Sequence, residues 1–201
     1  MTLRIHSYGA APHAGVLADA RATPPVADQP PVVFLGSIAS GHRMWLPQLD
    51  LLARHRRVLA LDYHGHGGAE KWTGRAELTA AEGMAPMVEG VLGLWVSEDF
   101  ARRHRATTEW LRAMIAATDG AGYAVYARVL AGFDSAAWLG RIACPVLTVA
   151  SAQDASTPPE RLAEIAAGAA GPVESVVVPG AHVPTFEARE EVNAALTEFL
   201  G

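Results

Sequence analysis

Five short segments of the chain have the patterns of β-strands, and loops or helices separate them. Two apolar runs rich in β-branched residues occupy 146–150 and Val173–Val178, which predicts buried strands. Shorter strand patterns occupy Val32–Leu35 and 57–61. Residues 2–8 instead alternate polar and apolar side chains, a pattern typical of an edge strand.

Helical patterns lie between these strands. Residues 44–55 repeat leucine at helical spacing, and similar patterns cover 159–169 and 187–200. Strands that alternate with helices indicate an α/β fold.

The middle of the chain has a different texture. From residue 72 to residue 139 there is no strand pattern, and apolar residues recur every three or four positions. Glycines divide this stretch into about four predicted helices. No fixed period is visible, so we interpret the stretch as a helical insertion and not as a repeat array. The predicted organisation is one structural unit with an α/β core at 1–71 and 141–201 and a helical cap at 72–140.

Composition narrows the functional classes. The chain has 201 residues, a net charge of −5 and no basic stripe, which argues against nucleic-acid binding. A single cysteine excludes an internal disulfide and a cysteine-based zinc site. No apolar run approaches the length of a membrane span, and the first residues lack a signal-peptide pattern. We therefore expect a cytoplasmic protein that binds neither nucleic acid nor membrane.

Two residues of catalytic type follow the last two predicted strands. Asp154 comes after the strand at 146–150, and His182 comes after Val173–Val178. In an open α/β sheet, ligands bind beyond the carboxyl ends of the strands. An aspartate there can fix the tautomer of a histidine, which then accepts a proton. Such a pair normally serves a nucleophile.

The ordered motifs resemble those of the α/β-hydrolases. They are GSI, DYHGHG, SAQDASTPPE and PGAH, and the text of the helical region is most similar to the 3-oxoadipate enol-lactonases. The resemblance implies a mostly parallel sheet with flanking helices and a cap, and hydrolysis of a small lactone or ester without a cofactor. It implies that Asp154 is the triad acid and His182 the triad base. It also implies that Ile38 supplies an oxyanion N–H from the turn that contains Ser37.

One departure from the family pattern outweighs these matches. The chain contains no G-x-S-x-G nucleophile elbow, and Gly68 to Trp72 leads directly from the HGHG loop into the cap. By comparison with the family roughly sixty residues are absent, including two central strands of the sheet. We therefore expect impaired hydrolysis. The alternative is a non-catalytic ligand-binding or interaction relative, a pseudoenzyme.

Several other residues could in principle act as the nucleophile, but each has a simpler structural interpretation. Ser37 and Ser40 fit turn chemistry, and Ser135 fits a helix cap. Asp62 could attack as a carboxylate, but a loop-stabilising acceptor is the simpler interpretation. Cys144 precedes a strand at the end away from the expected site, and we expect it to be a buried structural thiol.

Two further features bear on ligands. His64 and His66 with His42 and Asp62 could form a zinc site, but the family resemblance makes His66 a structural loop residue, so we expect no metal. Among the tryptophans, Trp72 and Trp95 are the candidates for contact with a substrate.

Loss of two central strands would leave unpaired strand edges. We expect the strands at 32–35 and 146–150 to pair directly around Val33 and Leu147, because buried N–H and C=O groups need partners. The second option is that the exposed edges pair between two chains in a homodimer.

Overall fold

The computed structural model describes residues 4–8, 32–35, 42–53, 58–62 and 69–201.

The first three strands form one sheet. The strands β1 (Arg4–Tyr8), β2 (Val32–Leu35) and β3 (Val58–Asp62) lie in the order β1-β3-β2. β2 runs parallel to β3, with Val32 opposite Val58, whereas β1 runs antiparallel to β3.

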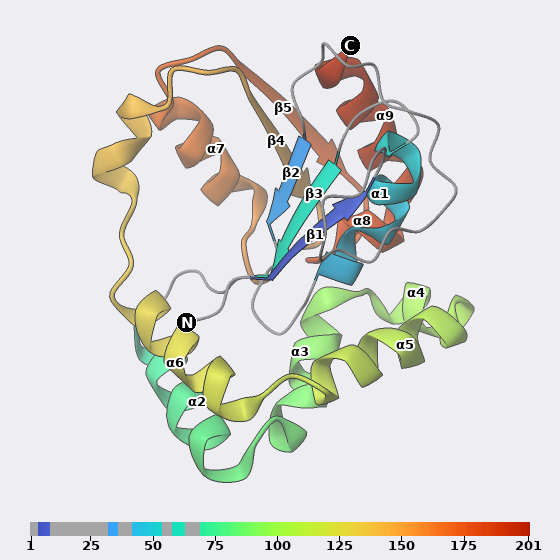
Figure 1. Ribbon diagram of the computed structural model, residues 1–201, viewed down its shortest axis with the longest axis vertical. Coiled ribbons are helices and arrows are strands. Elements are labelled where there is room, and N and C mark those ends of the chain that lie inside the picture. The colour runs from blue at the N-terminus through green and yellow to red at the C-terminus, as the bar shows by residue number, and fades with distance from the viewer. Residues whose placement is uncertain (1–3, 9–31, 36–41, 54–57, 63–68) are drawn as a thin grey trace.

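A second sheet carries the C-terminal part of the chain. Its two parallel strands are β4 (Val146–Ser151) and β5 (Val173–Val178), in register from Val146 opposite Val173 to Ser151 opposite Val178. Helices α7 (Pro159–Gly168) and α9 (Arg189–Leu200) flank this sheet (Figure 1). Apolar side chains from one face of both strands pack on α9, which is the burial that the β-branched runs predict.

Helix α9 also reaches the first sheet. Phe34, Leu49, Leu52 and Val58 form a small buried core between β2, β3 and α1 (Leu46–Leu52), and Leu200 at the end of α9 packs against it. The preceding 3₁₀ turn η1 (His42–Trp45) adds a stacked aromatic pair, Trp45 on Phe34.

Gln48 adds polar contacts between the two halves of the chain. Its side chain is fully buried and donates to the carbonyl of Thr185 (3.2 Å) and to Oδ1 of Asn193 (3.1 Å). Thr185 belongs to the short helix α8 (Pro184–Glu187), so α1 is fastened to both C-terminal helices.

Helices make up the part of the molecule farthest from the strands (Figure 1). We call residues 69–141 the helical segment, whose elements are α2 (Ala69–Glu82), η2 (Ala85–Met87), α3 (Val88–Trp95), α4 (Glu98–Arg103), α5 (Arg105–Ala116), α6 (Gly120–Ala131) and η3 (Ala136–Arg141). The largest hydrophobic cluster of the described residues lies mainly in it and also includes Met44 and Val183. No helix in the described ranges has the length and apolarity needed to cross a membrane.

Helices α2 and α6 pack side by side through backbone contact. Gly83 ends α2 with φ of +71°, a conformation that glycine adopts at little cost. A Cβ added at Gly120 would lie 2.7 Å from the Gly83 Cα and 2.8 Å from the Thr79 carbonyl oxygen. The close approach of the two helices therefore requires glycine at position 120.

The expected pairing of β2 with β4 is wrong. In the described residues β2 pairs with β3 and β4 pairs with β5, and the two strands belong to separate sheets. The halves are joined by side-chain packing of α9 on α1 and by the hydrogen bonds of Gln48, so no ladder between the sheets is needed to hold them together. Pairing of edges between two chains in a homodimer stays a prediction, which the mass of the protein in solution would decide.

The helical segment differs in detail from the glycine-based prediction. It has five α-helices in the described structure, because α3 and α4 are separate and Gly90 lies inside α3. The break occurs at Ser97, whose Oγ accepts from the Phe100 N–H (3.1 Å) and caps α4. The boundary between α3 and α4 is therefore marked by a serine cap and not by a glycine.

The predicted burial of Cys144 is also wrong. The thiol belongs to an exposed residue just before β4, and so Cys144 is not a buried structural residue. The apolar run that buries β4 begins only at Val146, which leaves the preceding turn in solvent.

We predict that Gly120→Ala destabilises the protein by roughly 1–3 kcal/mol, the usual cost of forcing atoms into a packed contact. The measurement is the free energy of unfolding in urea. Gly74→Ala in α2 is the matched control, because a Cβ there meets nothing within 4 Å. It should be neutral or stabilising, since alanine is the better helix former. Equal losses in both variants would contradict the backbone contact.

Candidate active site

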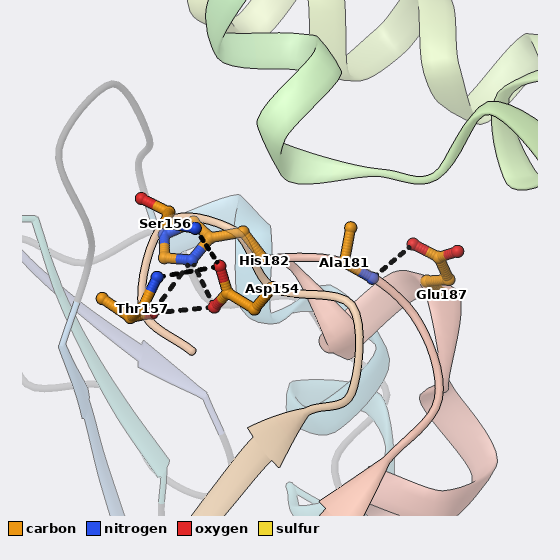
Figure 2. Close-up of polar contacts among 6 residues, drawn as sticks. All are labelled: Asp154, Ser156, Thr157, Ala181, His182 and Glu187. Carbon is orange, nitrogen blue, oxygen red and sulfur yellow. Dashed lines mark hydrogen bonds and ion pairs between the residues drawn. The ribbon is translucent and has the colours of Figure 1, made fainter. Parts of the chain in front are cut away.

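The Asp154 carboxylate is held by the loop that follows β4. Its Oδ1 accepts from the backbone N–H groups of Ser156 (2.7 Å) and Thr157 (2.9 Å), and its Oδ2 accepts from the Thr157 hydroxyl (2.7 Å) (Figure 2). This is the local turn that a short acidic side chain forms with the backbone two and three residues ahead. The loop therefore fixes the direction of the carboxylate.

The His182 loop follows β5 and is bonded to the Asp154 loop. The Gln153 N–H donates to the Gly180 carbonyl (2.9 Å), and the Ala152 N–H donates to the Val178 carbonyl (2.9 Å). Gly180 turns the chain with φ of +102°. Because β4 and β5 are parallel neighbours, their carboxyl ends bring Asp154 and His182 to the same edge of the sheet.

The two side chains meet in a hydrogen bond. His182 Nδ1 lies 2.8 Å from Asp154 Oδ2 and 3.3 Å from the Thr157 hydroxyl oxygen. The Asp154 side chain is 6% exposed and the His182 side chain 26% exposed, so the carboxylate is enclosed while the ring reaches solvent. With Nδ1 donating to the carboxylate, Nε2 is the ring nitrogen that can take up a proton.

The surroundings keep Asp154 ionised. Burial raises the pKa of its carboxyl and is the largest single effect, but the hydrogen bonds from His182 and Thr157 together outweigh it and lower the pKa to about 2. An ionised Asp154 orients the imidazole and stabilises the imidazolium that forms when Nε2 takes a proton. The pair can thus act as an oriented base.

Thr157 is a site residue that the sequence interpretation missed. Its backbone and its hydroxyl both bond to Asp154, and its oxygen also approaches the histidine ring. The signal was available, because a threonine three residues after an aspartate in a turn commonly bonds to that carboxylate.

The other predicted site residues have different outcomes. Ile38 and Ser37 lie outside the described residues, as do His64 and His66. Trp72 and Trp95 are buried in the hydrophobic cluster of the helical segment, at 6% and 4% exposure. Their contact with a substrate stays a prediction. Among the residues that the structure describes, no cluster of three or more His, Cys, Asp or Glu side chains could hold a metal ion.

A hollow lies between α1, α5 and α8. It has a volume of about 280 Å³ and is lined by Leu46, Ala106, Thr107, Trp110 and Phe186. The Trp110 and Phe186 rings meet there with centroids 5.6 Å apart. The sequence interpretation selected none of these residues for ligand contact.

Comparison with known proteins gives two kinds of match, although no family model matches the chain. In sequence it is 33% identical over 91 residues to 3-oxoadipate enol-lactonase 2 of Acinetobacter baylyi, a match that covers 45% of this chain and 34% of that protein. It is 22% identical over 193 residues to enol-lactonase 1 of the same organism, covering 64% of this chain and 73% of that protein. The first match thus spans about a third of that relative's length.

The structural matches cover nearly the whole chain. An enol-lactonase from Burkholderia xenovorans LB400 superposes with a TM-score of 0.84 at 20% identity, covering 98% of this chain and 96% of that one. A hydrolase from Pseudomonas aeruginosa superposes with a TM-score of 0.81 at 24% identity, covering 99% and 94%. The chain has the α/β-hydrolase fold. Its sequence is similar to that of the enol-lactonases, and the α/β-hydrolase fold is consistent with the short, mostly parallel sheets flanked by helices.

We predict that Asp154 stabilises this α/β-hydrolase fold in a pH-dependent way. Because its pKa of about 2 lies below the ordinary value of about 4, the ionised form favours the folded state above pH 4. That contribution is lost as the pH falls toward 2. Asp154→Asn should therefore lower the free energy of unfolding at pH 7 by about 2 kcal/mol, with a smaller deficit in acid.

The measurement is urea unfolding of both proteins between pH 2 and pH 7. Asp134→Asn is the control, because Asp134 is exposed and its Oδ1 accepts only a local N–H from Ala136 (2.9 Å). A deficit in Asp154→Asn that is the same at every pH would contradict the lowered pKa.

Proposed function

We propose that this chain is an α/β-hydrolase relative whose site accommodates a small lactone or ester, with hydrolysis impaired by the lack of a nucleophilic serine. The observation that carries the proposal is the 2.8 Å bond between His182 and Asp154 at the carboxyl ends of two parallel strands. Similarity to the 3-oxoadipate enol-lactonases supports the choice of a lactone or ester.

The proposed roles follow from the chemistry of acyl transfer. His182 is the general base, and Asp154 holds its tautomer. The Ile38 N–H, in the turn with Ser37, would stabilise the oxyanion of the tetrahedral intermediate. Trp72 and Trp95 would contribute to the substrate pocket. No cofactor is needed, since every step is a proton transfer, an addition to the carbonyl or the loss of the leaving oxygen from the tetrahedral intermediate.

The chain between β3 and α2 supports the absence of a nucleophile elbow. β3 ends at Asp62 and α2 begins at Ala69, so only residues 63–68 separate them. An average strand alone would use all six residues, leaving none for the turn that carries the serine. The match to enol-lactonase 1 extends over 193 residues but takes in only 64% of this 201-residue chain, which also supports a loss of internal residues.

Without the serine, catalysis would depend on water. His182 could remove a proton from a water molecule as it attacks the carbonyl, and the oxyanion turn would stabilise the negative charge. The tetrahedral intermediate would then collapse with cleavage of the acyl C–O bond, and His182 would pass its proton to the leaving oxygen. Loss of the nucleophile from a hydrolase triad lowers kcat by about a million-fold. The residual activity comes from substrate binding and from stabilisation of the oxyanion. The alternative function is therefore a non-catalytic protein that keeps the fold for ligand binding or interaction.

We predict that hydrolysis of a p-nitrophenyl ester exceeds the buffer rate and falls by about tenfold or more in His182→Ala, as expected for loss of a general base. The measurement is release of p-nitrophenol at pH 7. Surface imidazoles also cleave such esters slowly, so His104→Ala is the control. His104 is exposed, and its ring stacks on Phe100. It is the single residue between α4 and α5 and lies outside the His182 loop. Equal rates in the parent and His182→Ala would contradict the hydrolase function and favour the pseudoenzyme.

A further inference from the structure

We propose that Glu187 is a positioning residue for His182, because its carboxylate fastens the His182 loop to the helical segment. Its Oε2 accepts from the backbone N–H of Ala181 (3.1 Å) (Figure 2) and from the backbone N–H of Ser97 (3.1 Å). Its Oε1 accepts from the Ser97 hydroxyl. One side chain thus joins the residue next to His182 to the turn between α3 and α4.

Two main-chain bonds continue this junction. The His182 N–H donates to the Leu94 carbonyl (3.3 Å), and the Val183 N–H donates to the Trp95 carbonyl (2.9 Å). These carbonyls belong to the last turn of α3, where a helix leaves acceptors without internal partners. Three consecutive N–H groups, from Ala181 to Val183, are therefore bonded, so the backbone of His182 is fixed on both sides.

Ser97 is held in a single orientation by its own partners. Its hydroxyl accepts from the Phe100 N–H (3.1 Å) as the cap of α4 and donates to Glu187. Because both functions of the hydroxyl are used, the carboxylate meets a donor that cannot turn away without loss of the helix cap.

The fold leaves room for this carboxylate at Gly180. A Cβ at that position would lie 2.8 Å from Cγ and 2.9 Å from Cδ of Glu187, and Gly180 has φ of +102°. Only glycine satisfies both conditions. The turn before His182 is thus shaped around the Glu187 side chain, independently of the hydrogen bonds that the carboxylate accepts.

The consequence concerns the ring of His182. Asp154 holds Nδ1 from the β4 loop, whereas Glu187 holds the backbone at Ala181, the residue before His182. If the backbone moves, Nδ1 leaves the carboxylate and the ring can adopt the Nε2-protonated tautomer, which is the wrong form for a base. Glu187 acts through position and need not touch a substrate.

The test reads the tautomer of His182 directly by long-range ¹H–¹⁵N correlation spectra, with His182→Ala for assignment. In the parent protein we expect the Nδ1-protonated form to dominate. Glu187→Gln keeps one oxygen that accepts but replaces the other with an NH₂ group that cannot, so at least one of the three donors loses its acceptor. It should raise the Nε2-protonated population relative to the Nδ1-protonated one by about fivefold, the effect of one lost hydrogen bond. Glu187→Asp should keep part of the parent's preference. Glu190→Gln is the control, because Glu190 is exposed in α9 and should leave the ratio unchanged.

A parent-like tautomer ratio in folded Glu187→Gln would overturn the proposal, as would a parent protein in which Nδ1 carries no proton. If circular dichroism shows that Glu187→Gln does not fold, Ser97→Gly decides. Glycine is itself an acceptable helix cap, and this variant removes the hydroxyl that donates to Glu187. A shift toward the Nε2-protonated form supports the proposal, and an unchanged ratio overturns it. The proposal deepens the proposed function, but the spectra need no hydrolysis, so a failed esterase assay would leave it standing.

Discussion

Insertion of the His182 loop into the helical segment is the constraint on which the site depends. Val183 is 2% exposed and belongs to the hydrophobic cluster formed mainly by the helical segment. Burying a valine side chain contributes roughly 1.5–3 kcal/mol. Together with the hydrogen bonds to Leu94, Trp95 and Glu187, this burial places the loop after β5 against α3. The catalytic-type histidine is therefore located by packing that begins outside its own sheet.

The remaining contacts follow from this arrangement. Asp154 comes from the neighbouring strand and meets His182 because β4 and β5 are parallel and in register. α8 and α9, which follow the loop, reach the first sheet through Gln48, which is buried and donates to both. The chain thus keeps one connected structure although its strands form two separate sheets in the described residues.

The sequence predicted the parts of this structure that depend on local pattern. The run Val173–Val178 has the same bounds as β5, and position after a strand was enough to select Asp154 and His182, which the structure brings together. Contacts between segments far apart in the sequence were harder to predict from the sequence. Glu187 and Ser97 lie 90 positions apart, so no local pattern relates them. The expected β2–β4 pairing was wrong. The prediction rested only on the need to pair strand edges and left out the packing of α9 on α1.

The central claim is that an oriented acid–base pair is retained without an activated serine. Intact-protein mass spectrometry after treatment with a fluorophosphonate tests it most directly, because these reagents form a covalent bond with a serine that a neighbouring histidine activates. The account predicts that the mass stays unchanged at reagent concentrations that label a serine hydrolase completely. A stoichiometric adduct that maps to a serine and disappears in His182→Ala would contradict it, since another serine would then serve as the nucleophile.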